Sequence, residues 1–228
     1  MIQKRSRRVW LASMLIACIA WLGFVAARQA ASDLYAHTIS VEIESWSRPG
    51  HKFRGDELPR AIASIEKSLA ITPSSAWALE QMGALQFGRV RSATDPQIAV
   101  AAARAAYVNF KKALGQHPTS PFAWANLAMA KAYLGEIDAE LFDALTRSAE
   151  FGPWEAPAQF TALLVGLGVW NQASPAQREM ILAIRDRAVM RNADKVNEIA
   201  KGFNRLDLMC DRKTGKSPGG RSCPRVSS

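Results

Sequence analysis

The chain has 228 residues, 49% of them hydrophobic, and its 29 Lys and Arg against 20 Asp and Glu give a formal net charge of +9. Ala-rich helical periodicity recurs along the chain and no alternating Val, Ile and Thr run is present, so we expect an all-α protein rather than one built on a β-sheet. The basic residues gather at the two ends and are not interleaved with aromatic residues on one face, which argues against a nucleic-acid-binding protein.

An apolar segment follows the basic N-terminal tail. Residues 9–27 carry no charge and are bounded by Arg8 and Arg28. At about 1.5 Å per residue they reach roughly 28 Å, close to the hydrocarbon thickness of a membrane. The alternative is a cleaved signal peptide, whose apolar region is usually about 7 to 15 residues and ends in small residues. Because the run is longer and Arg28 falls in the cleavage window, we expect an uncleaved signal anchor.

The charges beside this segment predict its orientation. Lys4, Arg5, Arg7 and Arg8 precede it, whereas only Arg28 follows closely. The excess of positive charge places the N-terminus in the cytoplasm. In a bacterium, the chain after the anchor would then lie in the periplasm, held at the inner membrane.

Residues 30–43 are expected to continue the anchor helix, and 45–55 to form a linker because they contain Pro49, Gly50 and Gly55. A helix is predicted over 56–70, followed by one over 76–87. A polar, turn-rich insert at 88–96 is then expected to form a long loop before a helix over 96–114, which Asp95 caps and Pro96 begins.

The most regular segment is residues 120–155. Ser120 caps a helix over 121–134, Gly135 and Glu136 form a tight turn, and a second helix runs over 137–150. Trp124, then Leu127 and a small residue, then Leu-Gly and a closing Pro, is the order of the tetratricopeptide (TPR) repeat. A single hairpin of this kind cannot bury its own apolar face, so neighbouring repeats are expected.

Related positions occur at the same offsets elsewhere in the chain. They are Ala61, Ile65 and Pro73; Ala106, Phe110 and Pro118; and Leu141, Leu145 and Pro153. Later helices over 154–172, 174–191 and 194–209 are expected to cap the stack.

The predicted fold is therefore all-α, with one N-terminal transmembrane helix followed by a TPR-like stack of α-helical hairpins forming a right-handed α-α superhelix. Its parts are a cytoplasmic tail (1–8), the transmembrane helix (9–27), a juxtamembrane helix and linker (28–55), the TPR-like domain (56–210) and a basic, disordered tail (211–228).

The sequence contains no recognised catalytic motif. It has no Gly-rich phosphate loop, no GxSxG or HExxH motif and no Cys pair at zinc spacing. We therefore expect no enzyme activity, cofactor or metal. Cys210 and Cys223 would lie on the oxidising side of the membrane, where they either form a disulfide or remain two free thiols.

A binding role is better supported. In TPR stacks the first helix of each hairpin lines a concave groove, and the corresponding positions here are Trp77, Glu80, Ala84, Phe87, Phe122, Ala125, Met129 and Tyr133. The alternative is that these aromatic residues pack between helices. Trp124, Leu127, Phe110 and Ala106 are assigned to packing outright, and we expect Trp124 to be buried.

The combination of an anchor, degenerate TPR-like helices, the segments WANLAMAKAYLGEID and ALTRSAEFGPWE, and an apolar helix ending at Trp170 resembles the VpsP-type proteins of bacterial exopolysaccharide gene clusters. The resemblance runs from about Leu34 to Cys210 and is strongest over 118–170. The insert at 88–96 and the basic tail depart from it. It implies a part in exopolysaccharide synthesis or export and no defined reaction.

Three functions follow from the sequence. The first is a scaffold that binds protein partners of an envelope complex assembling or exporting polysaccharide. The second is the same scaffold in another envelope process, such as cytochrome maturation or cell division. The third is a glycan-binding or glycan-processing protein that uses Trp77, Trp154 or Trp170 as sugar-stacking surfaces.

Overall fold

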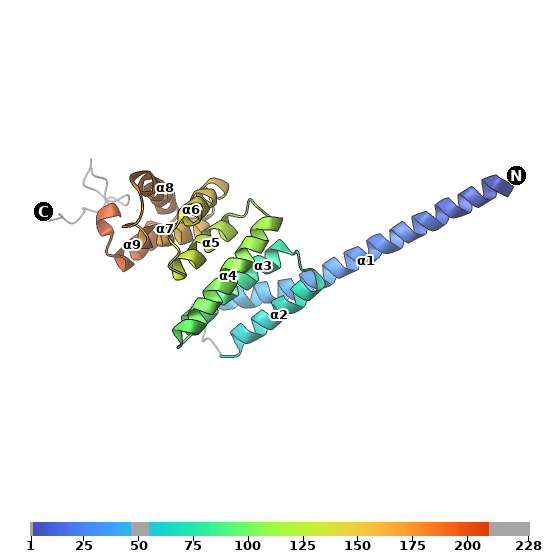
Figure 1. Cartoon of the computed structure of the whole chain (residues 1–228), viewed down its shortest axis with the longest axis horizontal. Coiled ribbons are helices and arrows are strands. Elements are labelled where there is room, and N and C mark those ends of the chain that lie inside the picture. The colour runs from blue at the N-terminus through green and yellow to red at the C-terminus, as the bar shows by residue number, and fades with distance from the viewer. Residues whose placement is uncertain (1, 47–54, 210–228) are drawn as a thin grey trace. The chain divides into compact units, whose positions relative to one another are not determined.

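The computed structural model describes residues 2–46 and 55–209. Over these ranges it contains nine α-helices, one 3₁₀ turn and no strand, which confirms the predicted all-α class (Figure 1). The chain divides into two compact units, residues 1–78 and 79–228. The first holds the apolar N-terminal helix, and the second holds the helical stack.

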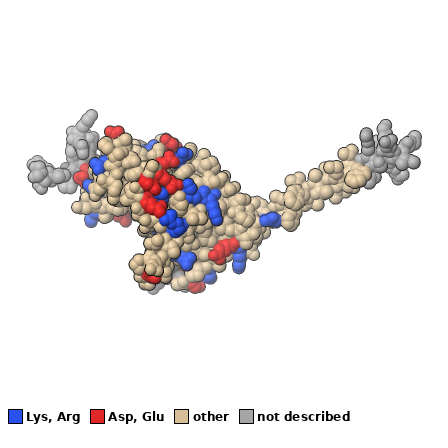
Figure 2. All heavy atoms as spheres, in the orientation of Figure 1, with Lys and Arg blue, Asp and Glu red and all other residues tan. Residues whose placement is uncertain are grey.

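Unit 1 begins with one long helix, α1 (Ile2–Trp46). Its segment Trp10–Ser32 has a mean hydropathy of 2.1 and is long and apolar enough to cross a membrane. Its side chains are exposed from Trp10 to Ala31, and Figure 2 shows this stretch almost free of charge. The helix contains the predicted anchor at 9–27 and continues past it, as expected for 30–43.

The second helix of unit 1, α2 (Glu57–Ile71), runs back along the C-terminal half of α1 (Figure 1). The hydroxyls of Ser32 and Ser68 lie 2.9 Å apart, and each lies 3.2 Å from the other residue's carbonyl oxygen. Both serines are buried. Because each buried hydroxyl is satisfied by the other helix, this pair sets the register of α1 against α2.

Unit 2 is a succession of antiparallel helices in which each packs against its neighbours. They are α3 (Ala76–Ser92), which starts at the end of unit 1, α4 (Pro96–Gln116), α5 (Pro121–Tyr133), α6 (Ala139–Phe151), α7 (Ala156–Gly168), α8 (Pro175–Arg191), α9 (Ala193–Gly202) and the 3₁₀ turn η1 (Leu206–Met209).

Local capping explains where most of these helices begin. The Asp95 carboxylate accepts a hydrogen bond from the Gln97 amide at 2.8 Å, and the Ser120 hydroxyl accepts one from Ala123 at 3.2 Å. Ser174 and Gln177 form a reciprocal capping box. Each interaction pairs an amide of the first turn that has no partner within the helix.

The repeated apolar positions form the core. Ala106, Phe110, Leu141 and Leu145 are completely buried, as are Ala61 and Ile65 in unit 1. Gly83 of α3 lies so close to the Phe110 ring that a Cβ there would come within 2.7 Å of it, and a Cβ at Gly166 of α7 would come within 2.9 Å of Ile181 of α8. Neighbouring helices therefore approach each other where a glycine faces a large side chain.

The prediction of a long loop at 88–96 is wrong. Helix α3 continues to Ser92, and only residues 93–95 separate it from α4. The extra residues of this repeat therefore lengthen its two helices. Val90 packs against the core, and this burial offsets the cost of about 1 kcal/mol for a helical glycine at Gly88.

Two details of the 120–155 hairpin differ from expectation, the start of its second helix and the burial of Trp124, whereas the turn at Gly135 agrees with it. The second helix begins at Ala139, because Asp138 caps it by accepting a hydrogen bond from the Leu141 amide at 3.1 Å. Gly135 takes the left-handed backbone conformation, with φ of 72°, in the predicted turn. Trp124 is half-buried rather than buried, and its indole nitrogen donates to the Pro118 carbonyl at 2.7 Å.

Replacing Gly83 by Ala should destabilise the protein. The added Cβ would overlap the rigid Phe110 ring, and overpacking of this kind costs about 1 to 3 kcal/mol. At roughly 2 to 4 °C per kcal/mol for a chain of this length, thermal unfolding in detergent, followed by circular dichroism, would detect the loss.

Gly115→Ala is the matched control, because a Cβ at Gly115 meets nothing within 4 Å. It should be neutral or raise stability by about 0.5 to 1 kcal/mol, the difference between Gly and Ala in a helix. Equal melting temperatures for the two variants would contradict the close α3–α4 contact.

Candidate functional site

A hollow in unit 2 lies between α5, α7 and α9. Its volume is about 390 Å³, and most of its lining is apolar. Figure 1 shows α7 between α5 and α9. The lining residues are Met129 from α5; Phe160, Thr161 and Leu164 from α7; and Lys195, Glu198, Ile199, Gly202 and Phe203 from the end of the chain that contains α9.

Helical spacing brings these side chains to one surface. Phe160 and Leu164 are four residues apart and lie on one face of α7. Ile199 lies in the last turn of α9, and Phe203 is the residue that directly follows this helix. Phe160 and Leu164 are half-buried against the core, Phe203 is 39% exposed, and Ile199 is buried with 7% of its surface exposed. The hollow is thus a space with a mostly apolar lining that no side chain of the stack fills.

Charged side chains border the hollow on one side. The Lys195 ammonium lies 2.9 Å from the Glu198 carboxylate, and their side chains are 46% and 70% exposed. An exposed pair of this kind adds little stability. Its effect on the site is to place polar groups beside an apolar surface, the arrangement found in binding sites that combine affinity with orientation.

Of the predicted groove residues, Met129 lines this hollow, while the others lie elsewhere. Tyr133 is 47% exposed, and its ring centroid lies 5.7 Å from that of Phe87. Phe122 is half-buried, and Ala125 is completely buried. Tyr133 is therefore accessible at the surface of the helix that carries Met129, whereas Ala125 is part of the core.

Two predictions from the groove frame need correction. Phe87 is 7% exposed and stacks on Phe110 at 5.7 Å, so it belongs to the core. Glu80 is half-buried and accepts a hydrogen bond from the Ser120 hydroxyl at 2.9 Å, so it joins α3 to the start of α5. Trp77 is 39% exposed and lies in unit 1, so its role in a groove stays a prediction.

Glu80 also shows an electrostatic effect of this position. Burial raises the pKa of its carboxyl group, and the Ser120 hydrogen bond and the nearby His117 only partly oppose this. Because Ser120 also caps α5, one hydroxyl both begins the helix and satisfies the buried carboxyl group.

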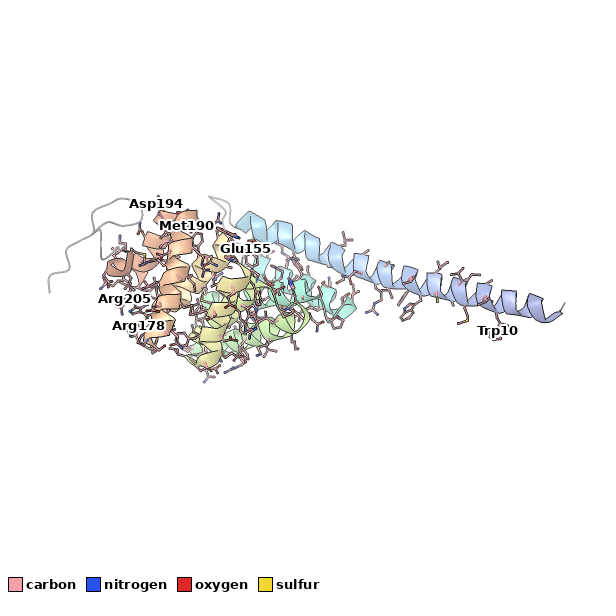
Figure 3. The ribbon with its side chains drawn as sticks, turned by 90° about the horizontal axis from the view of Figure 1, so that it is seen from above. Trp10, Glu155, Arg178, Met190, Asp194 and Arg205 are labelled. Atoms are coloured by element: carbon pink, nitrogen blue, oxygen red, sulfur yellow. The ribbon has the colours of Figure 1, made fainter. Side chains whose placement is uncertain are left out.

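The α7 and α9 residues of the hollow were not predicted from the sequence. Phe160, Leu164, Ile199 and Phe203 lie on helices expected only to cap the stack, although their four-residue spacing was visible. Trp170, by contrast, is 9% exposed. The Arg178 guanidinium packs on its ring, and both Arg178 and Arg205 donate to Asn171 at one end of the unit (Figure 3).

The opposite side of α5 carries a charged network centred on Lys131. This side chain is 3% exposed, and its ammonium lies 2.8 Å from Glu140, 2.9 Å from Asp138 and 3.5 Å from Glu136. The Tyr107 hydroxyl donates to Glu140 at 3.1 Å. Acidic and basic side chains interleave on the face of unit 2 in Figure 2.

Mutual hydrogen bonding holds this network in its charged state. Hydrogen bonds from Lys111 and Lys131 lower the pKa of Glu140 to about 2. Burial opposes the charge on Lys131, but its bonds to Glu140 and Asp138 outweigh that and raise its pKa. General acid–base catalysis needs a pKa near the working pH. The network is therefore suited to holding α4, α5 and α6 together.

Metal binding has no geometric support in the described ranges, 2–46 and 55–209. No three His, Cys, Asp or Glu side chains gather there closely enough to hold an ion. Cys18 is exposed on α1. Cys210 and Cys223, the predicted disulfide, lie outside the described residues.

Comparison with known proteins adds no family. No family model matches the chain, and no curated protein matches it significantly.

Replacing Lys131 by Met should destabilise the protein by about 1.5 to 3 kcal/mol, because three carboxylates lose a charged donor while the packing of the aliphatic chain is kept. Lys195→Met is the control: it removes an exposed pair and should change the free energy of unfolding by less than about 0.5 kcal/mol. Similar losses from both variants, measured by denaturant unfolding in detergent, would contradict the role of Lys131.

The low pKa of Glu140 predicts an acid-dependent loss of stability. Since the folded-state pKa is depressed to about 2, the contribution of Glu140 is fully present above its ordinary pKa of 4.5 and is lost as the pH falls toward 2. Glu140→Gln should reduce the difference in unfolding free energy between pH 6 and pH 2.5. An unchanged difference would show that Glu140 is not held charged by Lys111 and Lys131.

Proposed function

We propose that the protein is a membrane-anchored helical-repeat scaffold in which the apolar hollow between α5, α7 and α9 binds a segment of a protein partner. The hollow carries the proposal. An unfilled surface with Met129, two phenylalanines and two aliphatic side chains offers a pocket for large apolar side chains. Tyr133, exposed on the same helix, extends the surface available to the partner.

We further propose that the scaffold serves bacterial exopolysaccharide biosynthesis or export, without catalytic activity or cofactor of its own. The support is the resemblance to VpsP-type proteins, strongest over 118–170, a segment that contributes Met129 and the α7 residues to the hollow. The anchor would keep the scaffold beside the membrane proteins that make or export the polymer.

The proposed location is the bacterial inner membrane, crossed once by α1, with the N-terminus in the cytoplasm and the helical stack in the periplasm. Support comes from the apolar segment Trp10–Ser32 and from the excess of Lys and Arg before it over those that follow. A scaffold for another envelope process, such as cytochrome maturation or cell division, would share this location. The identity of the protein partner, recovered by crosslinking in membranes, distinguishes these processes.

Glycan binding is the second candidate, and the exposure of one tryptophan favours it. Trp154 is 69% exposed, with the Arg191 guanidinium 4.9 Å from its ring centre. Sugars pack on exposed aromatic faces of this kind. Titration of the purified protein with exopolysaccharide fragments, compared with Trp154→Ala, tests it, and equal binding of the two proteins would remove Trp154 as a sugar site.

Met129→Glu should release the partner from the scaffold. A buried charge in the hollow costs an interface about 2 kcal/mol or more, roughly a 30-fold loss of affinity. The measurement is crosslinking of the tagged full-length protein in membranes, followed by quantification of the recovered partner.

Ile98→Glu is the matched control, since Ile98 is 50% exposed on α4 and does not line the hollow. It should retain the partner and restore exopolysaccharide to a strain lacking the gene, whereas Met129→Glu should not. Full recovery of partner with Met129→Glu would refute the hollow as the binding site, and normal exopolysaccharide in the deletion strain would refute the pathway.

A further inference from the structure

The packing of unit 1 locates the level at which α1 leaves the membrane. The apolar segment of α1 is Trp10–Ser32. However, α2 covers one face of α1 from Ser32 onward, since Ser32 is 1% and Ile39 2% exposed. Lipid therefore cannot surround α1 there. The Arg28 guanidinium, one turn earlier, donates to the carbonyl oxygen of Ile71, the last residue of α2.

Two requirements place the end of α2 beside the lipid headgroups. A helix end has carbonyl groups that hydrocarbon cannot satisfy, and an arginine is costly in hydrocarbon, so neither Ile71 nor Arg28 belongs in the membrane core. The residues just before Arg28, from Phe24 to Ala27, are all apolar and exposed. The core therefore spans Trp10–Ala27, about 27 Å of helix, which suits a bilayer.

The segment that follows α2 has the composition of a headgroup contact. Pro73 and Ser74 are exposed, and a hydrogen bond from the Ser75 amide to the Thr72 carbonyl closes the turn at 3.1 Å. No Asp or Glu occurs between Lys67 and Leu79. Trp77, six residues after Ile71, is 39% exposed, and tryptophan is enriched at the membrane–water interface.

We propose that this end of unit 1, formed by Arg28, residues 71–75 and Trp77 and here named the hairpin base, rests on the lipid headgroups. The proposal rests on membrane anchoring by α1 and goes beyond it, because it names a second surface that contacts the bilayer. Trp77, predicted as a groove residue, is then an interfacial residue. The proposed ligand is the phosphate of a zwitterionic or anionic lipid headgroup, because hydroxyl groups and a guanidinium group can each donate hydrogen bonds to it.

The test is fluorescence quenching in the full-length chain with its three cysteines replaced by Ser. Single cysteines at Ser74 and at Ala63 carry a bimane label, and the protein is placed in phosphatidylcholine–phosphatidylglycerol vesicles in which some headgroups bear a nitroxide. Both positions are exposed, but Ala63 lies eight residues before Ile71, about 12 Å farther along α2, so quenching at Ser74 should be at least about twofold stronger.

A label at Leu22, read with lipids that carry the nitroxide on the acyl chain, separates the two levels of the hypothesis. Strong quenching at Leu22 with equal quenching at Ser74 and Ala63 would overturn the headgroup contact and leave the anchor intact. No quenching at Leu22 would overturn the anchor, and the headgroup contact with it.

Discussion

Close approach between small and large residues on successive helices is the constraint on which the helical stack depends. Gly83 faces Phe110, and Gly166 faces Ile181. A hairpin of two short helices buries too little apolar surface to be stable alone, so the contact with the next hairpin supplies the missing burial. Both glycine contacts lie within a hairpin, α3 with α4 and α7 with α8, and an added methyl group there would strain the packing of the two helices, since protein interiors are packed to crystal density.

The two sides of α5 divide the work of the site. One side carries the buried Lys131 and its carboxylates, which join α5 to α4 and α6. The other carries Met129 and faces α7 and α9 across the hollow. Because the charged side fixes the helix with several hydrogen bonds, the apolar side can remain unfilled without collapsing. If the hollow binds a partner as proposed, its preformed shape would spare the complex the entropic cost of ordering the site.

The sequence predicted those parts of the fold that depend on local signals. Ser120, Asp95 and Ser174 begin helices through hydrogen bonds within their own first turns, so their positions were correct to within a residue or two. Residues 88–96 were predicted to form a loop because this segment is polar and rich in turn-forming residues, but α3 continues to Ser92 and Val90 packs against the core. The repeat frame predicted Met129 as a groove residue, and Met129 lines the hollow. The contribution of α7 and α9 to the hollow depends on how helices distant in sequence pack together, and single-helix periodicity does not contain that information.

The uninterrupted course of α1 has a mechanical consequence. Its 45 residues form one helix, about 68 Å long, in which the segment long enough to span a membrane and the segment that packs on α2 share a continuous ladder of backbone hydrogen bonds. No loop separates the two, and the Ser32–Ser68 pair fixes the second segment to α2. If α1 spans a membrane, a tilt or axial rotation imposed on its apolar segment would therefore turn α2 through the same angle, so that the helix would act as a lever as well as a tether.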